Sequence, residues 1–72
     1  MTGPKIEHAL LLLPGVQDAE VRTVKAGVAL AIVTGGDRAQ CVMLVRNAVA
    51  FGVAAIVQHR DGIDGAYTEV MP

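Results

Sequence analysis

The chain has 72 residues, which limits it to a single domain over residues 1–72 with a small core. Its formal net charge is −1 and its six basic residues are scattered, so a nucleic-acid-binding surface is not expected. A single cysteine, Cys41, excludes an intramolecular disulfide and a zinc site built from several thiolates of one chain.

The hydrophobic content of 53% is high for so short a chain, and it is mostly aliphatic because the sequence has no Trp, one Phe and one Tyr. This surplus predicts that part of the surface is buried against a partner. The longest apolar run, residues 9–13, is too short to span a bilayer. The N-terminus also lacks the pattern of a signal peptide, so no membrane association and a cytoplasmic location are expected.

Residues 4–13 are predicted to form the first helix, with Pro4 at its first position. The helix presents a core stripe made of Ile6, Leu10 and Leu13. Leu11 and Leu12 extend the apolar surface further round the helix. Either the fold itself covers these two side chains, or one of them faces another chain. Pro14 and Gly15 then end the helix and turn the chain.

Two strands follow the turn. Residues 19–24 alternate between apolar and polar side chains, as in a strand with one wet face. Residues 28–33 are apolar on both faces, which is typical of a strand inside a sheet. One face carries the bulky side chains and the other the smaller ones: Val28, Leu30 and Ile32 against Ala29, Ala31 and Val33. The loop at residues 25–27, which contains Gly27, is expected to join the strands as an antiparallel hairpin.

The second strand leads into a turn and a second helix. Gly35 and Gly36 supply the turn, and Asp37 is a favoured N-cap residue. From Arg38 onward the apolar positions have helical spacing, with Arg46 and Asn47 on the far side: Cys41, Val42, Val45, Ala48 and Val49. Gly52 is predicted to end this helix as the C′ residue.

The last part of the chain contains a third strand and a turn. Residues 53–58 predict a strand that is apolar on both faces and ends at the polar Gln58, and residues 59–65 are rich in Asp and Gly. Residues 59–72 are therefore expected to be a turn followed by either a short strand or a tail, over residues 66–71.

The order of elements predicts an α+β fold, a two-layer sandwich of the form α-β-β-α-β with a fourth strand if the last segment pairs. It corresponds to a ferredoxin-like split βαβ without its usual first strand. A right-handed crossover places the third strand parallel to the second and both helices on one face of the sheet. Three arrangements remain open for the missing strand: direct pairing of its neighbours, filling by residues 66–71, or an open edge for another chain.

No catalytic or metal-binding constellation is found. The sequence Gly35-Gly36-Asp37 has neither of the glycine-rich phosphate-binding patterns, so it is interpreted as a structural turn and cap. His8 and His59 have no second ligand three or four residues away and are interpreted as surface histidines. Cys41 is interpreted as a buried structural thiol.

Asp61 and Asp64 lie beside glycines in a turn that supplies too few oxygen ligands for a calcium loop. The chain has no serine, so a serine nucleophile is excluded. A non-enzymatic protein without cofactor or metal is expected.

Several short motifs carry a resemblance to a known family: Leu13-Pro14-Gly15-Val16, the run from Ala31 to Asp37, and Phe51-Gly52. Over residues 6–64 the chain resembles the C-terminal domain of baseplate J-like proteins, which build the baseplate wedges of contractile phage tails and related injection machines. That family usually has a longer loop where this chain has residues 25–27. Its element order is also similar to ring-building modules of secretion and sporulation machines. A weaker similarity to heavy-metal-associated domains lacks their first strand and CxxC, so metal handling is not implied.

Two functions follow as expectations. The first is a structural assembly module, in the cytoplasm or in a virion, that binds a protein partner or further copies of itself. Its contacts are expected at an open strand edge or at a candidate interface of five residues: Leu11, Leu12, Met43, Tyr67 and Val70. The second is a small dimeric regulatory domain, ACT-like or metal-associated-like, that binds a small ligand near residues 34–37.

Overall fold

The computed structural model of the chain describes residues 3–25, 28–49 and 54–70. The elements follow the predicted order: α1 (Gly3–Leu11), β1 (Val16–Lys25), β2 (Val28–Gly35), α2 (Arg38–Ala48), β3 (Ala54–Arg60) and β4 (Thr68–Val70). The terminal segment is therefore a strand over Thr68–Val70 rather than a tail. Of the loop predicted at residues 25–27, Lys25 is the last residue of β1, and residues 26–27 lie outside the described residues.

The four strands form one mixed sheet in the order β1-β2-β3-β4. β2 is an interior strand, as predicted, because it pairs antiparallel with β1 and parallel with β3. The parallel register runs from Val28 opposite Ala54 to Thr34 opposite Arg60. The neighbours of the missing strand thus pair directly with each other, and β4 joins the sheet on the outer side of β3.

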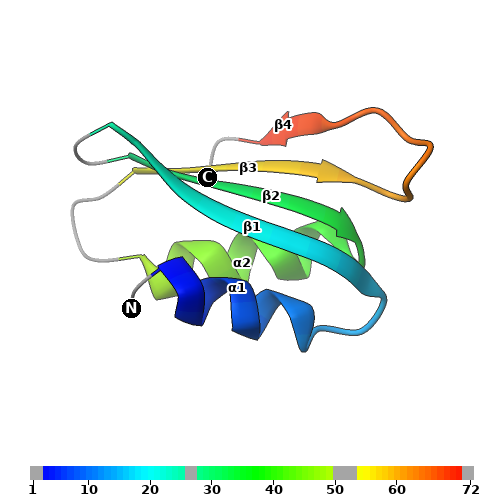
Figure 1. Cartoon of the computed structure of the whole chain (residues 1–72), viewed down its shortest axis with the longest axis horizontal. Helices are drawn as coiled ribbons and strands as arrows, with labels where there is room; N and C mark the ends of the chain where they lie inside the picture. Colours follow the sequence, from blue (N-terminus) through cyan, green and yellow to red (C-terminus); the bar gives the residue numbers. More distant parts are fainter. Residues whose placement is uncertain (1–2, 26–27, 50–53, 71–72) are drawn as a thin grey trace.

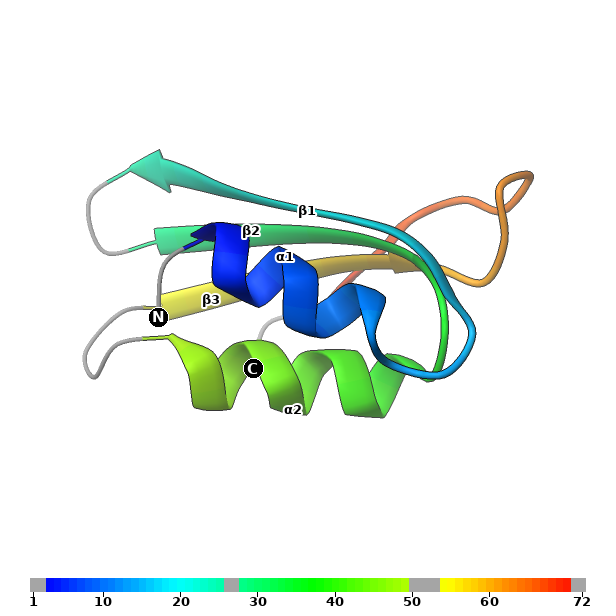
Figure 2. The same ribbon diagram turned by 60° about the horizontal axis from the view of Figure 1, so that its bottom comes forward.

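Both helices lie on the same face of the sheet, side by side (Figures 1 and 2). The α+β two-layer sandwich is therefore confirmed. Alternation along β2 sends the smaller side chains Ala31 and Val33 into the core beneath the helices. The core also contains residues from both helices and from β3: Ile6, Leu10, Cys41, Val45, Ala55 and Val57.

The junction between α1, β2 and α2 requires glycine. Gly15, Gly35 and Gly36 have φ values of 81°, 82° and 77°, in the left-handed region that glycine tolerates best. A Cβ atom on Gly36 would lie only 2.6 Å from Cγ2 of Val16. The predicted turns at these three glycines are confirmed, since they allow the start of β1 to pass close to the end of β2.

α2 begins where the sequence predicts and ends earlier. The Asp37 side chain caps the helix by accepting a hydrogen bond of 3.0 Å from the Gln40 N–H. The C-cap is Val49, which is extended and donates its N–H to the Val45 carbonyl at 3.0 Å. The helix therefore ends before the expected stop at Gly52, a residue that lies outside the described part of the chain.

α1 also ends earlier than predicted, at Leu11. The next N–H, from Leu12, is shared between the carbonyls of His8 at 3.3 Å and Ala9 at 3.2 Å, and this tightens the last turn. β1 is longer than predicted because the pairing with β2 continues past two irregularities, between Val16 and Asp18 and between Thr23 and Lys25.

The buried position of Val45 leads to a prediction. Val45→Asp places a carboxylate without a partner in the core, so we expect a loss of about 4 kcal/mol or more in the free energy of unfolding. Asn47→Asp, at an exposed position of the same helix, is the matched control and should change little. Thermal melts followed by circular dichroism measure both variants. An unchanged melt for Val45→Asp would show that the face of α2 assigned to the core is wrong.

Candidate functional site

One face of the sheet carries bulky aliphatic side chains and has no helix over it among the described residues (Figures 1 and 2). Val28, Leu30 and Ile32 of β2 lie on this face with Ile56 of β3, and all four are half-buried. We call these four residues the uncovered sheet face. Their neighbours in sequence, such as Ala31 and Val57, are fully buried on the other side. The strand thus turns its larger apolar side chains away from the core.

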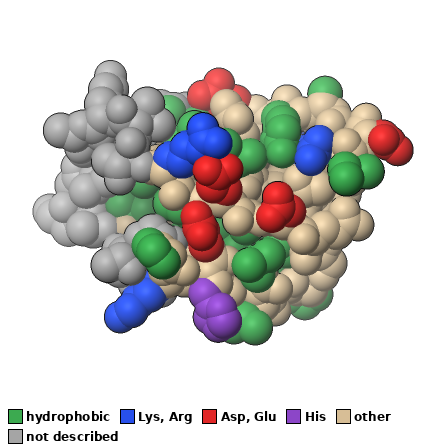
Figure 3. Space-filling view, viewed as in Figure 1, with side chains coloured by type: hydrophobic (Ala, Val, Ile, Leu, Met, Phe, Trp, Pro, Cys, Tyr) green, Lys and Arg blue, Asp and Glu red, His purple; other side chains and the backbone are tan. Residues whose placement is uncertain are grey.

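Charged and polar residues border the uncovered sheet face. On the β1 side, Arg22 lies opposite Leu30 and Glu20 lies opposite Ile32. On the β3 side, Gln58 lies opposite Ile32, and Glu69 of β4 lies opposite Gln58. An apolar centre with a polar rim is the usual anatomy of a protein–protein contact. Figure 3, which views the molecule from the side of α1 and β1, shows acidic, basic and apolar side chains intermixed.

Glu20 and Arg22 form an ion pair on this rim. Nε of Arg22 lies 2.6 Å from Oε1 of Glu20, and Nη2 lies 3.2 Å from Oε2, so the contact is bidentate. The hydrogen bond from Arg22 lowers the pKa of Glu20 and the same bond raises the pKa of Arg22. Both side chains remain exposed, so the pair contributes little to the stability of the monomer.

The residues predicted to contact a partner do not form a single surface. Leu11 and Leu12 are 46% and 72% exposed at the end of α1, so the fold does not cover them. Met43 is exposed on α2. Tyr67 directly precedes β4 and Val70 is the last residue of β4, the strand at the edge of the sheet opposite β1 (Figure 1). That these five residues touch a partner stays a prediction. The uncovered sheet face was not predicted from the sequence as a contact surface. The pattern that could have indicated it is that residues 28–33 are apolar on both faces.

The edges of the sheet offer little to another strand. The N–H of Val21, in the middle of β1, is already bonded to Oε1 of Glu7 from α1 at 2.8 Å. A strand adding to β1 would have to displace this carboxylate. At the opposite edge β4 is only three residues long. Within the described strands, the sheet therefore offers its face more readily than its edges.

A cluster of side chains covers the end of the uncovered sheet face, where β2 and β3 end. Nε of Arg60 donates to Oγ1 of Thr34 at 2.8 Å, and Nη1 donates to the Ile63 carbonyl at 2.9 Å. The guanidinium carbon lies 4.6 Å from the centre of the Tyr67 ring, a cation–π distance. The Tyr67 hydroxyl lies 3.5 Å from Oγ1 of Thr34. Arg60 thus holds the loop between β3 and β4 over Thr34, which is consequently buried.

The interpretation of His59 as a surface residue is wrong, since its side chain is fully buried. β3 extends beyond the predicted strand, and alternation places residues 55, 57 and 59 on the helix-covered face. Nε2 lies 3.0 Å from the Gly35 carbonyl and 3.1 Å from that of Gly36. Because both partners are acceptors, Nε2 carries a proton and donates it. His8, by contrast, is exposed on α1, as predicted.

Nδ1 of His59 is buried without a hydrogen-bond partner among the described residues. Oδ1 of the Asp61 carboxylate lies 4.0 Å from this nitrogen. The imidazole therefore links β3 to the turn that starts α2, and it belongs to no group of three possible metal ligands among the described residues. Sequence spacing does not reveal such a tie, since its partners are backbone atoms more than twenty residues away.

Cys41 is buried in the core at the start of α2, as predicted. Desolvation raises the pKa of its thiol, and the nearby Asp37 carboxylate adds to this effect. A thiol with a raised pKa is a poor nucleophile at neutral pH. No group of three or more His, Cys, Asp or Glu residues in the described chain could hold a metal ion.

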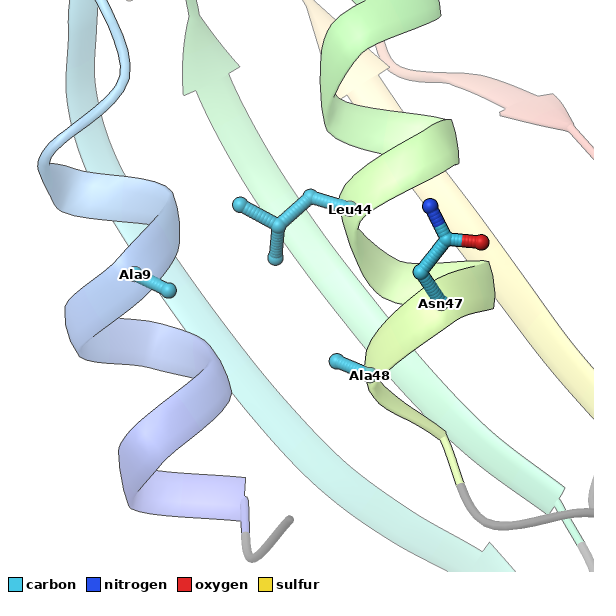
Figure 4. Close-up of a pocket in the computed structure, with 4 residues that line it drawn as sticks. All are labelled: Ala9, Leu44, Asn47 and Ala48. Carbon is cyan, nitrogen blue, oxygen red and sulfur yellow. The ribbon is translucent and has the colours of Figure 1, made fainter.

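An open hollow lies between the two helices (Figure 4). It is lined by Ala9 of α1 and by Leu44, Asn47 and Ala48 of α2. Leu44 points across toward α1, and the small side chains of Ala9 and Ala48 face the same gap from the two helices. Among the described residues of this lining, only Asn47 has a polar side chain, so they provide few groups with which to orient a polar ligand.

None of the described helices is both long and apolar enough to cross a membrane. The chain matches no protein-family model, no curated protein and no solved structure. The resemblance to baseplate J-like domains accordingly remains a prediction.

The His59 tie leads to a second prediction. His59→Phe keeps an aromatic ring in the core and removes the donor to the two glycine carbonyls, so we expect a loss of about 1–3 kcal/mol in the free energy of unfolding. His8→Phe is the matched control, since His8 is exposed. Urea unfolding of both variants gives the comparison. Equal stability of the two would mean that the His59 hydrogen bonds do not support the fold.

Proposed function

We propose that the chain is a non-enzymatic assembly module that binds another protein chain through the uncovered sheet face. The observation that carries the proposal is the placement of Leu30, Ile32 and Ile56 on a sheet face that no described helix covers. Antiparallel and mixed sheets with one solvated face normally place polar residues there. Bulky aliphatic side chains in the centre of that face are instead suited to burial against a partner.

The energetics favour contact through this face. Full burial of a Leu or Ile side chain is worth about 1.5–3 kcal/mol relative to exposure. The side chains of the uncovered sheet face are half-buried, so each retains part of this free energy for binding. Charges at the rim, such as Glu20 and Arg22, stay near solvent and would set the orientation of the partner.

The resemblance to baseplate J-like domains supplies the setting that we propose for this role. In that setting the chain is a component of a contractile phage tail or a related injection machine. Such a component works through contacts between folded domains and needs neither a catalytic group nor a cofactor. Its location is then the cytoplasm during assembly or the virion afterwards.

The alternative function, a regulatory domain that binds a small ligand near residues 34–37, receives less support. The Thr34 hydroxyl already accepts a hydrogen bond from Arg60, and the Asp37 carboxylate already caps α2. Asp37 also places negative charge at the N-terminus of α2, where an anionic ligand would otherwise be favoured. The polar groups of this region are therefore engaged within the chain.

Site-directed photocrosslinking tests the proposal. Ile32 and Ile56 are each replaced by the photoreactive residue p-benzoylphenylalanine in cells that produce the protein, and Gln40, exposed on α2, is replaced as the matched control. We expect protein adducts from positions 32 and 56, identified by mass spectrometry, and none from position 40. Circular dichroism confirms that each variant is folded. Folded variants that give no adduct at either sheet position would contradict the proposal.

A further inference from the structure

We propose that the occupant of the uncovered sheet face is a second copy of the same chain, related to the first by a two-fold axis that crosses β2 between Leu30 and Ile32. The inference rests on the proposed function and names its partner. Two such sheets would pack face to face about 10 Å apart, with the helices of each copy on the outside. Each copy would then supply the missing cover of the other.

The register of the sheet places charged and apolar side chains of the uncovered side in rows that a second copy can match. Residues directly opposite each other in a strand pair project to the same face. One row across the uncovered side therefore contains Arg22, Leu30 and Ile56, and the next row contains Glu20, Ile32 and Gln58. The second row continues to Glu69 on β4. The two rows are alike in their apolar centre and opposite in the charge that they carry on β1.

A two-fold axis across the strands, between these rows, exchanges one row for the other. Glu20 of one copy then lies over Arg22 of the second copy, and Arg22 lies over Glu20. At the centre Leu30 meets Ile32, and the same exchange places Ile56 over Gln58. Such a contact is isologous, the commonest symmetry of protein dimers.

An axis parallel to the strands would give a different result. It keeps each residue in its own row and exchanges the β1 side of the sheet for the β4 side. Glu20 of one copy would then lie over Glu69 of the other, and like charges would meet. The pattern of charge thus selects the axis across the strands.

The charges on β1 also favour a second copy over a charged partner of another kind. Glu20 and Arg22 form a bidentate ion pair, so this side of the face has no net charge that would attract a strongly charged partner. In the dimer the four side chains form a neutral ring at the rim. Met43 lies on the helix layer, outside this contact.

A charge-exchange experiment on the full chain tests the inference. Sedimentation equilibrium of the wild type should show a dimer with twice the mass of the 7.5 kDa chain. Glu20→Arg alone makes both β1 positions positive and Arg22→Glu alone makes both negative. Each variant should weaken its own dimer about tenfold or more. An equimolar mixture of the two variants should restore dimerisation, because the positive pair of one faces the negative pair of the other.

The double variant Glu20→Arg with Arg22→Glu should dimerise like the wild type, and thermal melts should show that all variants fold, since both side chains are exposed. A wild type that stays monomeric overturns the inference. So does a dimer that is indifferent to both single changes, or a crosslink from position 32 to a different protein. The last two outcomes leave the proposed function standing, whereas a monomer with no crosslinked partner removes both.

Discussion

The direct parallel pairing of β2 with β3 is the interaction on which the rest of the structure depends. It runs along the whole of β3 and along β2 up to Thr34, from Val28 opposite Ala54 to Thr34 opposite Arg60. Since α2 connects the end of one strand to the start of the other, the pairing places α2 beside α1 on one face (Figure 2). The same arrangement leaves the opposite face without a described helix. The core and the uncovered sheet face are therefore two consequences of one pairing.

The ends of these two strands are held from both sides of the sheet. On the helix-covered side, His59 donates to the carbonyls of Gly35 and Gly36 and so joins β3 to the start of α2. On the other side, Arg60 bonds Thr34 and stacks on Tyr67. His59 and Arg60, which are consecutive in β3, thus make contacts on opposite faces of the sheet. These contacts fix the strand ends, so the aliphatic side chains between them are presented on a defined surface.

Much of the fold could be predicted because its signals are local. The element order, the interior position of β2, the turns at Gly15, Gly35 and Gly36 and the Asp37 cap all follow from neighbouring residues. The burial of His59 could not be predicted, since it depends on β3 extending to Arg60. The contacts of Arg60 join residues distant in sequence. The predicted interface was chosen by residue type, whereas the uncovered sheet face is recognised only when the side covered by the helices is known.

Isoleucine methyl NMR can show whether the uncovered sheet face is the surface buried on assembly. The chain has four isoleucines: Ile6 in the core, Ile32 and Ile56 on the uncovered sheet face, and Ile63 in an exposed loop. As the concentration rises through the range of association, the methyl signals of Ile32 and Ile56 should shift while those of Ile6 and Ile63 stay in place. Association accompanied by a shift of Ile63 alone, or by no shift of Ile32 and Ile56, would show that another surface is buried.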